Sequence, residues 1–223
     1  MREIESGGER RYTRASRRGS TLIVVFAKAP QAGRVKTRLT GAIGADGAAR
    51  LHARLVERTV ITALAARCGP VELHGAPVGH AFFRTLARRH GLTLRPQVAG
   101  DIGERMHAVF RGALRRHRRV ILIGCDCPVL RAGDLRLAAR LLRGHDAVLA
   151  PAEDGGYPLI GLSRVSANVF DGIPWSGGEV LAQTRRRLTA LGWRWRELRT
   201  LWDVDHPQDL ARLQAMCLPG GLN

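Results

Sequence analysis

The chain has 223 residues, of which 45% are hydrophobic, and it carries a formal net charge of +17 at pH 7. This length fits one domain with a core of its own, and no apolar stretch approaches the roughly 18 residues that a membrane span needs. The basic charge invites a nucleic-acid-binding interpretation, but the arginines are spread over every expected helix and accompany no nucleic-acid-binding motif. We expect no specific nucleic-acid partner, only salt-sensitive nonspecific binding, and a surface that attracts a small phosphorylated substrate.

The cysteines and the N-terminal residues bear on cellular location. The four cysteines show no Cys-x-x-Cys spacing, and Cys125 and Cys127 alternate as residues at a strand end do, which favours buried thiols over a zinc site. Residues 1–20 hold six arginines and three glutamates and lack the apolar segment of a secretory signal. We expect a cytoplasmic protein with a disordered basic arm at residues 1–20 and one domain over residues 21–217.

Apolar strands and amphipathic helices alternate from residue 21 onward. Strands are expected at residues 22–26, 71–74, 92–95, 120–124, 147–150 and 157–162. Helices are expected at residues 46–67, 79–90, 103–117, 132–143, 177–191 and 207–217. This alternation predicts an α/β sandwich with a mainly parallel sheet, in which ligands bind beyond the carboxyl ends of the strands.

The loop after the first expected strand holds the chain's only two lysines. Lys28 and Lys36 lie in the sequence Phe-Ala-Lys-Ala-Pro-Gln-Ala-Gly-Arg-Val-Lys-Thr-Arg, whereas the other 34 basic residues are arginines. Their retention here indicates a need for a compact ammonium group. A strand, a loop containing Gly33 and then a helix is a common arrangement for binding phosphate, although the Walker pattern is absent. The alternative is a solvated basic loop without a ligand.

Two carboxylates are candidate ligands for a hard metal ion. Asp126 follows the most apolar expected strand, where a carboxylate suits Mg²⁺ or Mn²⁺ with phosphates and water completing the coordination. Asp205 lies in Trp-Asp-Val-Asp-His-Pro, where Asp203 and Asp205 are expected on one face of a strand. The alternatives are a turn-forming role for Asp126 and helix capping in the second segment, which is the expected role of Asp209.

Three further segments are candidates to border a nucleotide or substrate. Asp101 is a candidate helix cap, and Gly103 would let a base or ribose approach the backbone. Residues 153–157 read as a tight turn, whose carboxylates would bind sugar hydroxyls or act as a base. Trp175 and Ser176 precede a helix; Trp175 would either pack in the core or cover a substrate.

Six ordered motifs between residues 21 and 213 resemble a known family, the radical-SAM/selenodomain-associated transferases, also described as arsenosugar biosynthesis glycosyltransferases. They are Phe-Ala-Lys-Ala-Pro with Lys-Thr-Arg-Leu (26–39), Gly-Glu-Arg-Met (103–106), Gly-x-Asp-x-Pro (124–128), Asp-Gly-Gly-Tyr (154–157), Trp-Ser (175–176) and Asp-Val-Asp with Pro and Asp (203–209). The chain departs from the family pattern at Pro158, where an aromatic residue is usual, and at Gly177, where threonine is common. Both departures lie on the presumed substrate side.

The resemblance implies a three-layer nucleotide-diphospho-sugar transferase fold of the GT-A type, with a nucleotide and Mg²⁺ or Mn²⁺ as ligands. By that similarity Asp126 and Asp205 would hold the metal. The nucleotide phosphates would contact Lys28, Lys36 and Arg38, and the sugar or acceptor would be bordered by Asp154, Gly155, Gly156 and Tyr157. The segments described above add Gly33, Asp101 and Gly103 as candidates on the nucleotide side and Trp175 and Ser176 on the substrate side.

The function expected on this basis is metal-dependent transfer of a sugar from a nucleotide-sugar to a small-molecule acceptor. Lys36 and the ion held by Asp126 would stabilise the leaving diphosphate, and Asp154 would assist the acceptor. The alternative is nucleotidyl transfer, in which a phosphorylated substrate attacks a nucleoside triphosphate and pyrophosphate leaves. A non-enzymatic alternative is an Arg-rich nucleic-acid-binding protein on the same scaffold. The sequence leaves the oligomeric state open.

Overall fold

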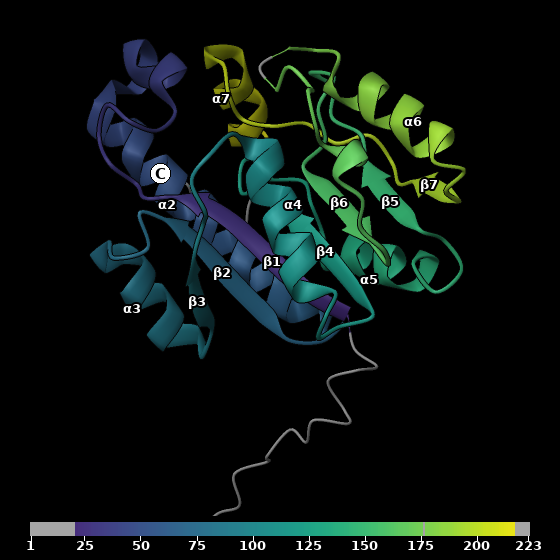
Figure 1. Cartoon of the computed structure of the whole chain (residues 1–223). Coiled ribbons are helices and arrows are strands. Elements are labelled where there is room, and N and C mark those ends of the chain that lie inside the picture. The colour runs from purple at the N-terminus through teal and green to yellow at the C-terminus, as the bar shows by residue number, and fades with distance from the viewer. Residues whose placement is uncertain (1–20, 176, 217–223) are drawn as a thin grey trace, which may run out of the picture.

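Within residues 21–175 and 177–216, which the computed structural model describes, seven strands form one mixed sheet in the order β3-β2-β1-β4-β6-β5-β7 (Figure 1). Every neighbouring pair is parallel except those that involve β6, which runs antiparallel to β4 and β5. The strands are β1 (Thr21–Lys28), β2 (Val71–Ala76), β3 (Thr93–Pro96), β4 (Arg119–Ile123), β5 (Ala147–Ala150), β6 (Leu159–Leu162) and β7 (Trp195–Glu197). The expected arm at residues 1–20, Ser176 and Cys217 lie outside the described residues.

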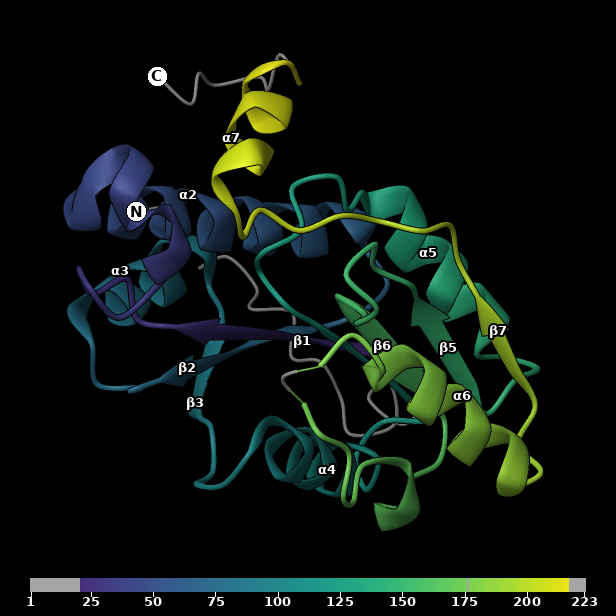
Figure 2. The same ribbon diagram turned by 90° about the horizontal axis from the view of Figure 1, so that it is seen from above.

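Helices cover both faces of the sheet, so the expected three layers are confirmed (Figure 2). One face carries α2 (Thr40–Ala66), α3 (Ala81–His90) and α5 (Ala132–Leu141), and the other carries α4 (Ile102–Ala113) and α6 (Val180–Ala190). The helix α7 (Pro207–Gln214) packs at one end against α2, and two short 3-10 helices, η1 (Thr37–Leu39) and η2 (Ala167–Val169), complete the elements. None of the helices in the described part of the chain is long and apolar enough to cross a membrane.

The neighbouring strands β1 and β4, in the middle part of the sheet, are apolar on both faces because each face packs against helices. In β1, Ile23 and Val25 contact the α2, α3 and α5 layer, whereas Leu22 and Val24 contact the α4 and α6 layer. All four are fully buried, and each such side chain contributes about 1.5–3 kcal/mol of transfer free energy. The continuous apolar runs noted in the sequence are therefore those of central strands in a sheet covered on both faces.

Two elements of the structure, α2 and β7, differ from the expectation. The helix α2 begins at Thr40 instead of residue 46, and it is interrupted at Gly44 by a φ of 70° and a ψ of 163°. None of residues 40–47 is buried, so no apolar spacing marked this part of the helix. The short edge strand β7 was not expected, because it has three residues and pairs only with β5. The strand at 147–150 has its expected bounds, and the other helices and strands listed above are present with shifted ends.

The expected strand at Asp203 and Asp205 is wrong. Residues 202–206 are irregular, and an isolated parallel bridge from Leu201 to Ala152 comes just before them. The amide of Val204 donates to the carbonyl of Asp126 over 2.9 Å. This single bond, rather than a ladder, holds the acidic segment beside the loop after β4.

The topology gathers the motif segments at one edge of the sheet. The strands β1 and β4 are parallel neighbours, with Val25 opposite Ile123. Lys28 lies three residues after Val25, and Asp126 lies three residues after Ile123, so both lie at the carboxyl ends of the two strands. The start of β6 pairs with the end of β4 and the end of β5, so the turn at residues 153–157 lies at the same edge.

A buried carboxylate of β2, that of Glu72, contacts both the edge strand β3 and the segment after α4. Glu72 is 6% exposed, and its Oε2 accepts hydrogen bonds from Arg95 Nε over 2.9 Å and from His74 Nε2 over 3.1 Å. The Nη1 of Arg116 lies 3.4 Å from Oε1. Burial alone would raise the pKa of Glu72, but the bonds from His74 and Arg95 outweigh burial and lower the pKa from 4.5 to about 2.

We expect Glu72→Gln to lower the free energy of unfolding at pH 7 by about 2 kcal/mol. Since the folded-state pKa lies below the unfolded value, the contribution of Glu72 is complete above pH 4.5 and is lost as the pH falls toward 2. The difference between wild type and variant in urea denaturation should therefore shrink over that range. Glu57→Gln is the control, because Glu57 pairs with Arg89 at the surface and should contribute less than about 1 kcal/mol. A wild-type–variant difference that stays constant from pH 7 to pH 3 would contradict the assignment.

Candidate active site

Lys36 joins the two candidate metal carboxylates. Its backbone is left-handed, with a φ of 49° and a ψ of 39°, immediately before η1, and its side chain is 4% exposed. The Nζ lies 2.6 Å from Asp126 Oδ1 and 3.6 Å from Asp205 Oδ1. Burial alone would lower the pKa of the Lys36 ammonium, but Asp126 outweighs burial and the pKa is raised. The group is therefore a fixed positive charge between two carboxylates.

Asp126 is held as a carboxylate at the end of β4. Burial would raise its pKa, but the neighbouring His52 and Lys36 outweigh that effect and hold the pKa well below its usual range. His52 Nδ1 lies 3.8 Å from Asp126 Oδ1, beyond hydrogen-bond distance, so its influence is electrostatic. The Nε2 of His52 lies 3.0 Å from the carbonyl oxygen of Lys28, which fixes the ring between the two motifs.

Asp205 is fixed from two sides. Its Oδ2 accepts a hydrogen bond from Nη1 of Arg38, and its backbone amide donates to Asp209 Oδ2 over 2.9 Å. The same Asp209 oxygen accepts from the amide of His206 over 2.6 Å at the start of α7. The capping role expected of Asp209 is thus confirmed, and capping also orients the loop that carries Asp205.

Two cavities meet at Asp126 and Asp205. The basic chamber has a volume of about 400 Å³, and its cationic lining residues are Lys28, Arg34, Lys36, Arg38 and Arg105. The acidic chamber has a volume of about 680 Å³, and its acidic lining residues are Asp126, Glu153, Asp154, Asp203, Asp205 and Asp209. Arg38, Ile102, Asp126 and Asp205 line both. The two carboxylates and the cations around them therefore lie at a junction between compartments of opposite charge.

Three residues expected beside the nucleotide line neither chamber. Gly33 lies in an exposed turn, and Asp101 caps α4 in a capping box with Glu104, as expected. A Cβ on Gly103 would lie 2.5 Å from Trp175 Nε1, so the absence of a side chain there lets the indole pack against α4. The contact that Gly103 makes in this structure is thus with Trp175.

Most of the described substrate-side residues line the acidic chamber, but Gly155 does not, because it packs against the backbone of Gly178. Asp154, Gly156, Tyr157 and Trp175 line it, whereas Ser176 lies outside the described residues. Asp154 Oδ1 accepts from the amide of Gly156 over 2.9 Å, which forms the expected turn. Burial raises the pKa of Tyr157, whose hydroxyl accepts a hydrogen bond from Thr184 over 3.4 Å. Trp175 stacks on Phe170 with ring centroids 6.5 Å apart, so it belongs both to the core and to the chamber wall.

Two residues of this site were not in the sequence-based set. Asp203 lines the acidic chamber, and its Oδ1 is buried without a hydrogen-bond partner in the described part of the chain. Burial, with the charges of Asp126 and Asp154, raises the pKa of Asp203 to about 7. The Asp-Val-Asp spacing drew attention to Asp203, but only folding gave it a buried position. His52 gave no sequence signal, because it sits among apolar residues of a long helix.

The oxygen donors at the junction fit a hard divalent cation. Asp126 is ionised, and Asp205 faces the same ammonium group of Lys36. If a metal ion displaced that ammonium group, both carboxylates would face the basic chamber, where phosphate groups would complete the coordination of the ion. One group of three possible ligands in the described residues is His52, Cys125 and Asp126. Burial raises the pKa of the Cys125 thiol well above its usual value, so this sulfur is a poor metal ligand. As expected, Cys125 and Cys127 are buried free thiols.

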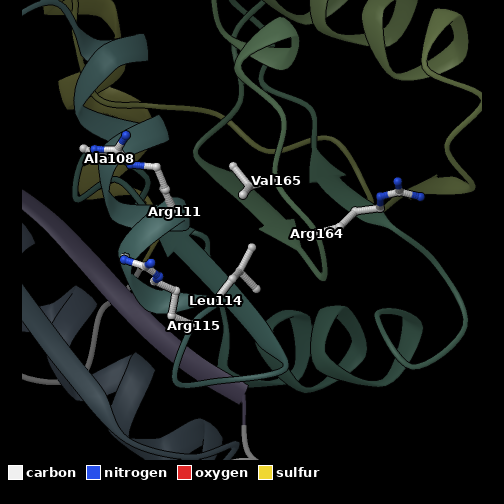
Figure 3. A pocket seen from close by; sticks show the side chains of 7 residues that line it. Ala108, Arg111, Leu114, Arg115, Arg164 and Val165 are labelled. Atoms are coloured by element: carbon white, nitrogen blue, oxygen red, sulfur yellow. The ribbon is translucent and has the colours of Figure 1, made fainter.

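A third cavity, of about 670 Å³, lies on the outer side of α4 and contains none of these residues (Figure 3). It is bordered by Arg111, Arg115 and Arg164 over an apolar floor that includes Leu114 and Val165. Arg164 lies over the ring of Trp193 at 5.2 Å, and Figure 3 shows its guanidinium pointing away from those of Arg111 and Arg115. The three cations do not converge on one point as an anion site would require.

Comparisons with solved structures place the fold. A candidate nucleotide-diphospho-sugar transferase from Desulfovibrio desulfuricans G20 is 29% identical, with a TM-score of 0.82 over 90% of this chain and 89% of that one. The CTP complex of CMP:2-keto-3-deoxy-manno-octonic acid synthetase is 14% identical, with a TM-score of 0.58 over 88% of this chain and 98% of that one. The manganese complex of Rv0371c from Mycobacterium tuberculosis H37Rv is 18% identical, with a TM-score of 0.53 over 88% of this chain and 99% of that one. The last two show a shared fold.

Among curated proteins, no relative matches the chain. Residues 59–177, more than half of the chain, match the family described as uncharacterized protein conserved in bacteria, DUF2064. The matched segment includes Asp126, which lines both chambers, and Asp154, Gly156, Tyr157 and Trp175, which line the acidic one. The chain therefore belongs to the DUF2064 family, and its α/β fold is that of nucleotide-diphospho-sugar transferases and nucleotidyltransferases.

Proposed function

We propose that this protein is a metal-dependent glycosyltransferase that moves a sugar from a nucleotide-sugar to a small-molecule acceptor. The observation that carries the proposal is the contact of Lys36 with Asp126 and Asp205 at the junction of the two chambers. A donor whose diphosphate lies at this junction would place its nucleotide in one chamber and its sugar in the other. The motif resemblance to the selenodomain-associated transferases supports the same reaction class.

The basic chamber would bind the donor diphosphate. Lys28, Arg34 and Arg105 line it together with Lys36 and Arg38, so five cations surround the space. Such groups neutralise the charge that develops on the leaving diphosphate, and they are already oriented before the reaction starts. Lys36 has the most restricted position, because its buried ammonium is held by the two carboxylates.

Asp126 and Asp205 would hold Mg²⁺ or Mn²⁺. The bound ion would act as a Lewis acid on the phosphate oxygens. Asp154, in the turn after β5, would accept the proton of the acceptor hydroxyl or orient that hydroxyl. These three roles belong to residues at the ends of β4 and β5 and in the segment before α7.

Nucleotidyl transfer to a small phosphorylated substrate is the second candidate. The number of cations in the basic chamber favours it, since a nucleoside triphosphate carries more charge than a nucleotide-sugar. The fold is common to both reactions, as the nucleotidyl transferase from Methanothermobacter thermautotroptrophicus, with a TM-score of 0.59 at 16% identity, illustrates.

A ligand panel read by thermal unfolding separates the two reactions. With Mn²⁺ present, we expect one nucleotide-sugar at about 100 times its Kd to add about 2.7 kcal/mol of stability, and we expect Lys36→Met to lose most of that gain. Arg140→Gln, on the surface of α5, is the matched control for loss of one cation. Stabilisation by a triphosphate alone would favour nucleotidyl transfer, and a response unaffected by removing the metal would count against both.

A further inference from the structure

The two chambers have opposite charge although the chain as a whole is strongly basic. Around the basic chamber, cations outnumber the two carboxylates at the junction. Around the acidic chamber there are six carboxyl groups, and Arg38 is the one Lys or Arg among the described residues that line it. A phosphorylated molecule is attracted to the first compartment and repelled by the second.

Four of the six acidic groups have partners that account for them. Glu153 receives two bonds from Arg212, over 2.7 and 2.9 Å, and Asp209 caps α7. Asp126 and Asp205 face Lys36. The remaining two, Asp154 and Asp203, have no cationic partner within salt-bridge distance among the described residues. These two carboxyl groups are therefore the acids of the chamber whose charge no neighbouring cation of the described residues offsets.

Both remaining acids offer oxygen atoms to a ligand. Asp154 uses Oδ1 to accept from the amide of Gly156 and is otherwise exposed at the chamber wall. Asp203 Oδ1 is fully buried and has no hydrogen-bond partner within the described residues. A buried polar atom without a partner costs free energy unless a ligand supplies one.

Two tryptophans, Trp175 and Trp202, also line the chamber. Trp175 Nε1 is buried against Gly103 of α4, so this residue contributes aromatic surface and no hydrogen-bond donor to the chamber. A carboxylate can only accept hydrogen bonds, and a hydroxyl group can donate them. A ligand with several hydroxyl groups on a ring therefore matches the acids, and its apolar face matches the aromatic lining.

We infer that the acidic chamber binds its substrate through hydroxyl groups on an uncharged sugar-like ring and rejects phosphorylated molecules, with Asp154 and Asp203 as the residues that set this specificity. The inference rests on the proposed function, which places a nucleotide in the adjacent chamber. It assigns Asp203 a contact to the substrate, a role distinct from that of Asp205 two residues later. The inference also argues against a phosphorylated second substrate. Since nucleotidyl transfer needs such a substrate, the inference favours glycosyl transfer.

The test is calorimetric titration of the full chain with matched pairs of sugars. Glucose, galactose and mannose are each compared with their 6-phosphates, with Mn²⁺ and the best-binding nucleoside diphosphate already saturating. We expect at least one uncharged hexose to bind tenfold or more tightly than its phosphate. The titrations are made at pH 8, above the Asp203 pKa of about 7, so that both acids are mainly ionised. Asp154→Asn and Asp203→Asn should each weaken binding of that hexose several-fold and reduce the difference in affinity between the hexose and its phosphate, because each removes a negative charge.

Asp171→Asn is the control, since Asp171 is exposed and lines neither chamber; it should bind like the wild type. Binding of a 6-phosphate as tightly as its hexose, or failure of all three hexoses to bind, overturns the inference. So does an unchanged preference in the Asp154→Asn/Asp203→Asn double variant. Mn²⁺ and the nucleoside diphosphate are titrated first, without sugar, to test the proposed function separately. If they bind and the sugars then do not bind, only the inference about the acidic chamber is overturned.

Discussion

Asp126→Asn is expected to reduce turnover at least about a hundredfold while the protein stays folded. The substitution keeps the shape of the side chain but removes the charge that pairs with Lys36 Nζ over 2.6 Å. It also removes one of two carboxylates available to a divalent cation, and an amide oxygen is a weaker ligand for a hard ion. Lys36 retains Asp205, 3.6 Å from its Nζ, so the buried ammonium keeps a partner and the fold is expected to survive.

The measurement is the rate of nucleoside diphosphate release from the nucleotide-sugar that stabilises the protein most. Circular dichroism and a thermal denaturation curve establish that the variant is folded. Asp171→Asn, an exposed neutralisation outside both chambers, should leave the rate unchanged. A folded Asp126→Asn protein with wild-type turnover would mean that the carboxylate at the end of β4 has no part in the reaction.

Gly155→Ala is expected to destabilise the protein by about 2–4 kcal/mol and to open the acidic chamber. Gly155 has a φ of +84°, and a Cβ at this position would lie 1.9 Å from the carbonyl oxygen of Gly178. That oxygen belongs to the backbone, so it cannot move as a side chain would. The carbonyl of Gly155 also accepts a hydrogen bond from the amide of Leu181 over 2.8 Å. The substitution should therefore separate the turn after β5 from the start of α6.

Gly192→Ala is the matched control for backbone strain. Gly192 has a φ of +65°, and a Cβ there would meet nothing within 4 Å, so its substitution should cost only about 1 kcal/mol. Urea denaturation of both variants gives the two free energies of unfolding. Equal losses of stability in the two variants would show that the close approach of Gly155 to Gly178 does not affect the free energy of unfolding.

The location of the site could be read from the sequence because it depends on local chemistry. A run of buried apolar residues followed by a polar loop marks the carboxyl end of a parallel strand, so Lys28 and Asp126 were identifiable without a structure. The capping functions of Asp101 and Asp209 depend on residues three positions away and were equally accessible.

Residues 202–206 show the limit of this approach. The alternation of Asp203 and Asp205 predicted a strand, but this segment meets the rest of the sheet through the Leu201 bridge and the single bond from Val204 to the carbonyl of Asp126. A sequence pattern carries no information about whether a neighbouring strand has free hydrogen-bonding groups at that position. Consequently the sequence could not show that Asp203 would be buried without a hydrogen-bond partner for one oxygen, whereas Asp205 would contact Lys36 and Arg38.

Strand and helix periodicity and capping are short-range properties, so the alternation of strands and helices, apart from the short strand β7, and the charged loops could be predicted from the sequence. Which of these charges meet is a property of the folded chain. Packing placed Lys36 between Asp126 and Asp205, residues from segments up to 169 positions apart, and buried Asp203 beside a second chamber of opposite charge. Electrostatic energy depends on distance and burial, and both are fixed only when the segments pack.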